Sequence, residues 1–406
     1  MNFIPNPGQR RLINDFIPFT KNYNEQVFEI SGGPGTGKST IMQYLARLTG
    51  VEMYYIAPMA YTGAASIVMR LNGFPHARTI HSWTYRREDK EVVDKFGHTV
   101  YDTFFNRPLK KPAFEPVGLP SDIIYVFVDE AGSVAEEHAK QLFQSNAKIV
   151  ACGDVDQLPP VTGERAFFKD SSKVHYLDQI MRQGPGSNII YLANRAKLGL
   201  DIQYGYYGDC YVTDEDDLTD EMLMYSDIVI CGTNKKRDEI NKRVREIKGL
   251  AGYDLPARGE QLVCRKNDYR IEIDGINLAN GLIGRVISAP DASSFDGKTF
   301  DFSFKPNLFN GVFTHLRGDY EFLNIPCALK KSAKMDKYNP GQKFEFAYAI
   351  TSYIAQGSQF NNGIYIEEYL SPEINDKSNY VGITRFKRNM IYIKRKRKFY
   401  NIPMTA

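Results

Sequence analysis

The sequence predicts an α/β fold in which parallel β-strands alternate with helices. Short apolar runs typical of buried strands recur at 27–30, 53–56, 123–128, 148–152 and 228–231. Stretches with apolar residues at helical spacing separate several of these runs. A glycine-rich segment joins the first run to such a helical stretch. Together these observations indicate a doubly wound α/β architecture with parallel sheets.

Length and composition are those of a folded protein with two to three domains. The chain has 406 residues, of which 43% are hydrophobic and 24% charged. The longest purely apolar run, 123–128, is far shorter than the roughly 20 residues of a spanning helix. The amino terminus lacks the basic and apolar regions of a secretory signal. We therefore expect a soluble protein without a membrane partner.

Charge and cysteine content restrict the possible partners only weakly. Lys and Arg total 51 and Asp and Glu total 48, a net charge of +3. This balance does not require a polyanion, but it allows one to bind in a local groove. The five cysteines lie at least 21 residues apart, which argues against a disulfide framework and a zinc knuckle and favours a reducing cytoplasm. Most of the 26 Tyr and 25 Phe are expected in the core, and a few as platforms for bases.

Two segments interrupt the α/β pattern. Residues 84–120 are polar and dotted with proline, with an alternating stretch around a turn next to Phe96, which indicates an inserted hairpin. Residues 254–345 contain short β-like runs separated by Gly, Asn and Asp, which indicates a small inserted β-barrel. The expected α/β domains are 1–83 with 121–170, and 171–253 with 346–406.

Residues 32–39 match the phosphate-binding pattern G-x-x-x-x-G-K-[ST] in full. Its glycines let backbone N–H groups face a β-phosphate, Lys38 neutralises the β- and γ-oxygens, and Ser39 offers a hydroxyl to Mg²⁺. The alternative, a glycine-rich turn without a nucleotide, is disfavoured because the segment lies between a strand and a helix. The predicted nucleotide-binding residues here are Gly32, Gly33, Pro34, Gly35, Thr36, Gly37, Lys38, Ser39 and Thr40.

A pair of carboxylates, Asp129 and Glu130, ends the apolar run 123–128. Asp129 is suited to hold Mg²⁺ directly or through water, and Glu130 to accept a proton from an attacking water. Alone, such a pair is often just an exposed strand end. With a phosphate-binding loop about 90 residues upstream, it predicts hydrolysis of a nucleoside triphosphate.

A third motif, GDVDQLPPV at 153–161, follows the run 148–152. With the preceding motifs and YVGITR at 380–385, it makes the chain resemble superfamily 1 helicases of the B branch, which contains RecD-like and phage Dda-like enzymes. The resemblance implies two RecA-like P-loop NTPase domains, an inserted hairpin and an inserted SH3-like β-barrel. It also implies that Gln157 senses the γ-phosphate.

The resemblance assigns further nucleotide contacts. Gln9 matches a glutamine that reads the adenine edge. Arg182 and Arg385 match two arginines that reach the γ-phosphate from the second domain. Gly357 lies in a motif at 349–359, in which this chain has Tyr353 and an isoleucine where relatives usually have His-Lys. The implied catalytic set is Lys38, Glu130, Gln157, Arg182 and Arg385.

Contacts to a nucleic acid strand are implied for Pro58, Met59, His81, Phe96, Asn234 and Tyr353. Phe96 would be an apolar wedge at the hairpin tip. The alternatives are a structural role for His81 and packing of Phe96 under its own hairpin.

The function implied is an ATP- and Mg²⁺-dependent DNA helicase that moves 5′→3′ on single-stranded DNA and unwinds forked duplexes. The resemblance further suggests a monomer in a bacterial or phage-infected cytoplasm that acts in replication, repair or recombination, with single-strand-binding or replication proteins as partners. Three alternatives stay open: a translocase that displaces proteins with little unwinding, an RNA helicase, and a nucleotide-gated scaffold without hydrolysis.

Overall fold

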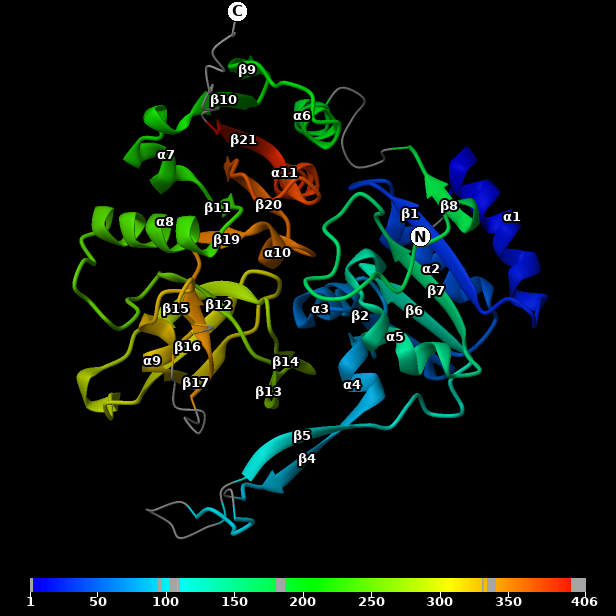
Figure 1. The fold of residues 1–406 in the computed structure, drawn as a ribbon, viewed down its shortest axis with the longest axis horizontal. Helices are drawn as coiled ribbons and strands as arrows, with labels where there is room; N and C mark the ends of the chain where they lie inside the picture. The colour runs from blue at the N-terminus through cyan, green and yellow to red at the C-terminus, as the bar shows by residue number, and fades with distance from the viewer. Residues whose placement is uncertain are drawn as a thin grey trace, which may run out of the picture.

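The computed structural model describes residues 3–93, 96–101, 108, 110–179, 187–330, 332–333 and 341–395. It contains two six-stranded sheets, a five-stranded sheet and two two-stranded ribbons among these residues (Figure 1). The predicted α/β class with parallel sheets is confirmed. No described helix is long and apolar enough to cross a membrane.

The first sheet is parallel and has the order β3-β2-β6-β7-β1-β8. Its strands are β1 (Val27–Gly32), β2 (Ile56–Ala60), β3 (Arg78–Thr79), β6 (Tyr125–Asp129), β7 (Lys148–Gly153) and β8 (Val174–Leu177). The helices of this half are α1 (Pro7–Lys21), α2 (Lys38–Leu48), α3 (Gly63–Leu71), α4 (Ile80–Thr84) and α5 (Glu136–Phe143). Buried side chains of α1, α2 and α3 pack on one face of the sheet, and those of α4 and α5 on the other.

One strand prediction is wrong in position. Residues 53–55 form a 3₁₀ turn in which Tyr54 is exposed, and the buried strand is Ile56–Ala60. The proline at position 58 argues against a central strand in the sequence, because proline cannot donate to a sheet. The strand nevertheless lies between two partner strands.

The second sheet has the order β19-β11-β20-β21-β10-β9 and is parallel except for the β9–β10 pair. Its strands are β9 (Gly205–Tyr207), β10 (Cys210–Asp214), β11 (Ile228–Cys231), β19 (Ala349–Thr351), β20 (Phe360–Ile366) and β21 (Phe386–Lys394). Its helices are α6 (Asn188–Lys197), α7 (Asp220–Tyr225), α8 (Asn234–Ile247), α10 (Ser352–Ala355) and α11 (Asn375–Ile383). Ile228 and Ile230 pack under α6 and α11, whereas Val229 faces α8, as alternation along a strand requires.

Residues inserted before β19 form an antiparallel sheet of order β17-β16-β15-β12-β18. Its strands are β12 (Gln261–Cys264), β15 (Ile283–Ser288), β16 (Thr299–Pro306), β17 (Phe313–Asp319) and β18 (Phe344–Phe346), with α9 (Tyr320–Asn324) beside them. A ribbon of β13 (Asp268–Ile273) and β14 (Ile276–Leu278) extends from it. Phenylalanines from three of its strands fill its core. In the strand order β17 and β18 stand at opposite ends, so the closed SH3-like barrel stays a prediction.

A hairpin lies within the predicted insertion 84–120. β4 (Tyr85–Glu91) pairs antiparallel with β5 (Lys110–Pro116) and projects from the body of the molecule just beyond α4 (Figure 1). Past these strands, Phe96 is 73% exposed and Gly97 has a φ of 86°.

A buried ion cluster joins the inserted sheet to the second α/β half. Glu345 of β18 forms ion pairs with Arg237 of α8 at 2.6 Å, Arg265 at 3.0 Å and Lys330 at 3.0 Å. Burial alone would raise the pKa of Glu345, but the three cations lower it to about 2. Because the folded-state pKa lies below the unfolded value, this cluster stabilises the fold above about pH 4.5 and loses that effect as the pH falls toward 2.

Replacing Glu345 with Gln should therefore destabilise the protein, by about 3–5 kcal/mol near pH 7, because three partly or fully buried cations lose their counter-charge. The difference from the wild type should shrink as the pH falls from about 4.5 toward 2. Urea unfolding of both proteins over this range measures it. Equal stability of the two at neutral pH would contradict the assigned role.

Candidate nucleotide and strand-binding sites

The phosphate-binding loop connects β1 to α2. Gly35 has a φ of 78° and Gly37, the N-cap of α2, a φ of 86°, values that residues with a side chain rarely adopt. The loop curls around Lys38, whose Nζ donates to the carbonyls of Gly32 at 2.6 Å and Gly33 at 3.1 Å. Backbone N–H groups and a helix N-terminus thus surround one lysine, an arrangement that favours a bound phosphate.

A cavity of about 350 Å³ opens beside this loop and is bounded by both α/β halves. The first half contributes the predicted residues Pro34, Gly35, Gly37, Lys38, Ser39, Thr40, Asp129, Glu130 and Gln157, and the second half Gly357 and Arg385. The remaining loop residues lie behind it: Gly32 packs against Thr36 and Leu177, and Gly33 against Tyr380. Residues more than 300 positions apart in the sequence therefore meet at one site.

Asp129 ends β6, and Glu130 follows it with a φ of 53°. This left-handed backbone is strained for a residue with a side chain and is typical of functional sites. The Glu130 N–H donates to Asp129 Oδ1 at 2.9 Å. Burial, and next the charge of Glu130, raise the pKa of Asp129 to about 6. Glu130 Oε2 is buried and has no hydrogen-bond partner among the described residues.

The turn after β7 carries Gln157, a buried residue whose Oε1 also has no hydrogen-bond partner in the described part of the chain. Arg165 holds this turn by donating to the carbonyls of Val155, at 2.8 Å, and of Gln157. The turn lies close to the segment after Glu130, because a Cβ on Gly132 would be only 2.8 Å from the Asp154 carbonyl oxygen. Glycine at 132 thus permits the two loops to approach.

These groups fit a magnesium ion. The Ser39 hydroxyl and the carboxylate of Asp129 are oxygen donors, the type that Mg²⁺ prefers. Across the described ranges no three His, Cys, Asp or Glu residues gather as a metal cluster. That is expected where one or two protein oxygens share the cation with phosphates and water.

Arg385, at the end of α11, brings a buried cation to the cavity. Its guanidinium donates to the Val381 carbonyl at 3.1 Å and to Thr384 Oγ1 at 3.2 Å, and it has no carboxylate partner among the described residues. A buried cation without a counter-ion at this wall suits a polyanionic ligand. The other predicted arginine, Arg182, lies outside the described residues.

Comparison with known proteins agrees with this geometry. Residues 5–200 match the model of the AAA domain family. Pif1 helicase structures share the fold of nearly the whole chain. One, of two coordinating Pif1 helicases at forked double-stranded DNA, is 16% identical with a TM-score of 0.55 and covers 97% of this chain and 92% of that one. The chain therefore shares the fold of these Pif1 helicase structures.

Two further structures extend the comparison. Pif1 helicase from Bacteroides, in complex with ADP-AlF3 and ssDNA, is 14% identical with a TM-score of 0.53, over 96% of this chain and 92% of that one. Pif1 helicase from Candida albicans is 15% identical with a TM-score of 0.52, over 97% and 96%. The resemblance inferred from the motifs is thus confirmed at the level of the fold, and the AAA match supports the prediction of an ATP-hydrolysing enzyme.

Gln9, expected to contact the adenine edge, lies at the start of α1. Its side chain closes a capping box at the start of α1: Gln9 Oε1 accepts from the Asn6 N–H at 3.1 Å, and the Gln9 N–H donates to Asn6 Oδ1 at 2.8 Å. Gln9 does not line the cavity. The sequence carried this signal, since Asn, Pro and Gln at these spacings are typical of a helix N-terminus.

The contacts to a nucleic acid strand predicted for Pro58 and Met59 cannot be made by their side chains. Both residues lie in the buried strand β2, and Met59 has no exposed surface. The Pro58 carbonyl accepts from Trp83 Nε1 at 3.1 Å, so it too is used internally. In a parallel sheet covered on both faces, only residues beyond the strand end reach a ligand.

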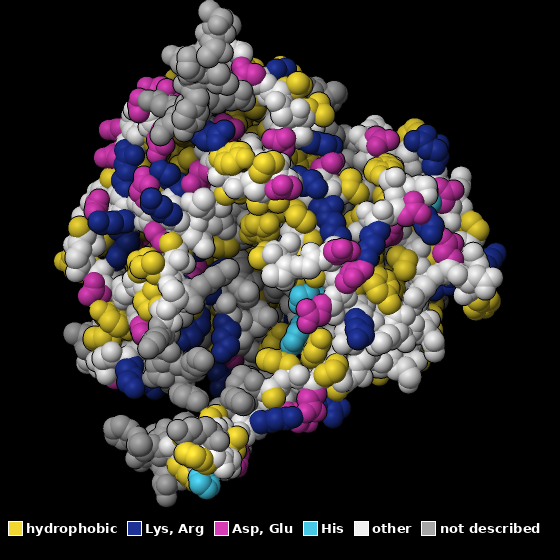
Figure 2. All heavy atoms as spheres, viewed as in Figure 1, with side chains coloured by type: hydrophobic (Ala, Val, Ile, Leu, Met, Phe, Trp, Pro, Cys, Tyr) yellow, Lys and Arg dark blue, Asp and Glu magenta, His cyan; other side chains and the backbone are white. Residues whose placement is uncertain are grey.

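His81 does lie in a groove, of about 550 Å³, where α3, α4 and the base of the hairpin face the β13–β14 ribbon. Its ring stacks on Tyr85, with centroids 4.3 Å apart, and meets Phe114 edge-on at 4.7 Å. Burial, and next the charge of His138, lower the pKa of His81. Figure 2 shows a hollow between the inserted sheet and the first half, with histidine side chains on its wall.

Sequence reasoning missed most of this groove, which also contains Arg70, Arg78 and Tyr269. Aromatic faces beside cationic side chains are typical of surfaces that bind single strands. The high Tyr and Phe content indicated in the sequence that some aromatic residues could stack on bases, but it does not show which residues form the groove.

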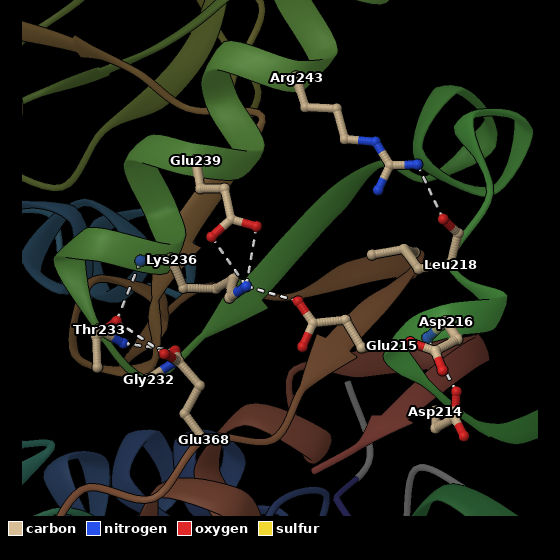
Figure 3. Close-up of polar contacts among 10 residues, drawn as sticks. All are labelled: Asp214, Glu215, Asp216, Leu218, Gly232, Thr233, Lys236, Glu239, Arg243 and Glu368. Carbon is tan, nitrogen blue, oxygen red and sulfur yellow. Dashed lines mark hydrogen bonds and ion pairs between the residues drawn. The ribbon is translucent and has the colours of Figure 1, made fainter. Parts of the chain in front are cut away.

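Asn234 and Tyr353 line neither cavity. Asn234 is exposed at the start of α8, and Tyr353 of α10 packs partly buried against the second core. Figure 3 shows that the turn before Asn234 is occupied by Glu368, whose carboxylate accepts from the N–H groups of Gly232 and Thr233, both at 2.8 Å. A strand phosphate at this turn would have to displace that carboxylate.

Replacing Glu130 with Gln should slow ATP hydrolysis by about 10²–10⁴-fold with little change in ATP affinity, because the amide keeps the shape but accepts no proton. Steady-state ATPase assays and nucleotide-binding titrations measure the two effects. Glu137→Gln, which alters an exposed carboxylate on α5, serves as the matched control and should keep wild-type rates. Near-normal turnover of the Glu130 variant would remove its assignment as the proton acceptor.

Proposed function

We propose that this chain is an ATP-driven DNA helicase that moves 5′→3′ on single-stranded DNA and separates duplexes. The observation that carries the proposal is the shared cavity. Lys38, Glu130 and Gln157 line it from the first half, and Arg385 lines it from the second. The Pif1 structures of the same fold hold ssDNA or stand at forked dsDNA, which supports DNA as the polymer.

The residues divide the work of hydrolysis. Lys38 and the loop N–H groups bind the phosphates, and Ser39 and Asp129 would hold Mg²⁺, which when bound neutralises phosphate charge. Glu130 takes the proton of the attacking water, and Gln157 contacts the terminal phosphate. Arg385, with Arg182 as its proposed companion, meets the charge that develops in the transition state. Since the arginines come from the second half, hydrolysis requires that the two halves close.

The groove around His81 is proposed to hold the strand. Bases stack on the faces of aromatic residues such as His81, Tyr85 and Phe114, and Arg70 and Arg78 attract the backbone. As the two halves open and close, the first half and the inserted ribbon, which face each other across this groove, then grip the strand in turn and move it stepwise. The resemblance makes replication, repair or recombination the expected setting.

A duplex with a 5′ single-stranded overhang should be unwound in the presence of Mg-ATP, whereas one with only a 3′ overhang should not. Fluorescent strand-displacement assays with both substrates test this, together with ATPase assays with and without single strands. Unwinding of only the 3′-overhang substrate would contradict the proposed polarity.

Controls separate the alternatives. Lys38→Ala should abolish hydrolysis and unwinding but leave strand binding intact, since the groove is built from other residues. Strand-stimulated hydrolysis without unwinding of either substrate would favour the protein-displacing translocase. Stimulation by RNA but not DNA would favour an RNA helicase, and no hydrolysis at all a scaffold.

Phe96 is proposed to act as a wedge at the duplex end. It is exposed on the projecting hairpin, and stacking on a base is worth roughly 1–3 kcal/mol, comparable to about 1.4 kcal/mol for one base-pair step. Phe96→Ala should keep strand-stimulated ATPase and translocation but lose most duplex unwinding.

Tyr225→Ala is the matched control, because Tyr225 is 86% exposed and lines neither cavity. It should unwind like the wild type. Equal losses of ATPase, translocation and unwinding in the Phe96 variant would assign Phe96 a structural role instead.

A further inference from the structure

A buried hydrogen bond connects the two α/β halves next to the nucleotide cavity. The hydroxyl of Tyr380, on α11, donates to Asp154 Oδ2, in the turn after β7, at 2.9 Å. Both residues are buried. They lie 226 positions apart in the sequence. Asp154 follows a strand of the first sheet and Tyr380 belongs to a helix of the second half, so this contact exists only while the halves are together.

Asp154 organises the turn that carries Gln157. Its Oδ1 accepts from the Asp156 N–H at 2.9 Å, and its carbonyl accepts from the Gln157 N–H at 3.2 Å. Arg165 holds the same turn from within the first half. The position of the Gln157 side chain therefore depends on Asp154, and through it on Tyr380.

Tyr380 also touches the phosphate-binding loop and shares a helix end with Arg385. A Cβ added to Gly33 would lie 3.2 Å from the Tyr380 hydroxyl oxygen. The Arg385 guanidinium donates to the carbonyl of Val381, the residue after Tyr380. A displacement of α11 thus moves Tyr380 and Arg385 together, relative to both Gly33 and the Gln157 turn.

Core packing explains the ring of Tyr380 but not its hydroxyl. The ring belongs to the buried core of the second half, where phenylalanine would fill the same space. The hydroxyl instead reaches a carboxylate of the other half. Burial, and next the charge of Asp154, raise the pKa of Tyr380, so the hydroxyl keeps its proton and acts as donor.

We propose that Tyr380 is a positioning residue for Gln157: through Asp154 it sets the glutamine amide against the phosphate cavity when the halves close. Hydrolysis then responds to closure through two groups of the second half, Arg385 at the phosphate and Tyr380 behind Gln157. This inference rests on the proposed ATPase function.

Tyr380→Phe tests the inference, because it removes one hydroxyl and keeps the ring. The kcat of strand-stimulated ATP hydrolysis should fall roughly tenfold or more, the effect of losing a hydrogen bond to a carboxylate. The KM for ATP should stay within about twofold, since Lys38 and the loop are unchanged. If the Tyr380 hydroxyl had only a structural role, Tyr380→Phe would lower the thermal stability and change the KM instead.

Asp154→Ala and the double variant Asp154→Ala/Tyr380→Phe provide a second test of the inference, which does not depend on Tyr380→Phe alone. If the two residues act through one bond, the double variant should be no slower than Asp154→Ala. Lys197→Met is the matched control: Lys197 joins the second half to the same turn by a partly exposed ion pair with Asp156 and lies 5.8 Å over the Tyr380 ring. Its loss removes these contacts but keeps the bond from the Tyr380 hydroxyl to Asp154, and should change kcat by less than about twofold.

Three results would overturn the inference: wild-type kcat in Tyr380→Phe, multiplicative losses in the double variant, or an equal loss in Lys197→Met, which would mean that any contact between the halves suffices. A wild-type chain that hydrolyses no ATP with single strands would remove the proposed function itself. An active wild type matched by Tyr380→Phe would remove only the role of Tyr380.

Discussion

The carboxyl edge of the first parallel sheet is the constraint on which the nucleotide cavity depends. β6, β7 and β1 are neighbours that run in the same direction, so the segments that follow them emerge side by side. Strand pairing therefore brings together the phosphate-binding loop, the Asp129–Glu130 pair and the Gln157 turn. The second half has only to present α11 across this edge for Arg385 to complete the cavity.

Electrostatics distinguish this edge from the rest of the protein. At β18 the buried carboxylate of Glu345 has three cations around it, which is the arrangement expected where charge serves the fold. At the cavity the pKa of Asp129 is raised by burial and by a second carboxylate, and Glu130 and Gln157 each bury an oxygen that no described residue satisfies. Two such oxygens beside a carboxylate with a raised pKa favour a ligand at this edge, because buried polar groups normally have partners.

The sequence was informative where chemistry and local structure coincide. The phosphate loop, the carboxylate pair and the apolar strands could be predicted because each needs particular residues at fixed spacing. Gln9 could not be placed, because the residue types of an adenine contact are also those of a capping box. The motif that contains Pro58 and Met59 marks a strand end but does not say which side chains leave the core, and both residues lie in the buried strand β2. The aromatic groove was missed because tertiary packing, and not sequence proximity, joins Tyr269 to Phe114.

The helix α3 shows how the two cavities are related in space. Ala65 and Val68 line the nucleotide cavity, whereas Ser66, Ile67 and Arg70 line the aromatic groove. A period of 3.6 residues places these two sets on different faces of one helix. The small residues at its start admit close neighbours: the Ala64 N–H donates to a carbonyl of the inserted sheet's loops at 3.1 Å, and a Cβ on Gly357 of the second half would lie 3.4 Å from that of Ala65. Since packed interiors transmit displacement, any shift of this helix changes the wall of the nucleotide cavity and the wall of the groove together. Coupling between the proposed nucleotide and DNA-strand sites therefore needs no long pathway, because one helix separates the two cavities.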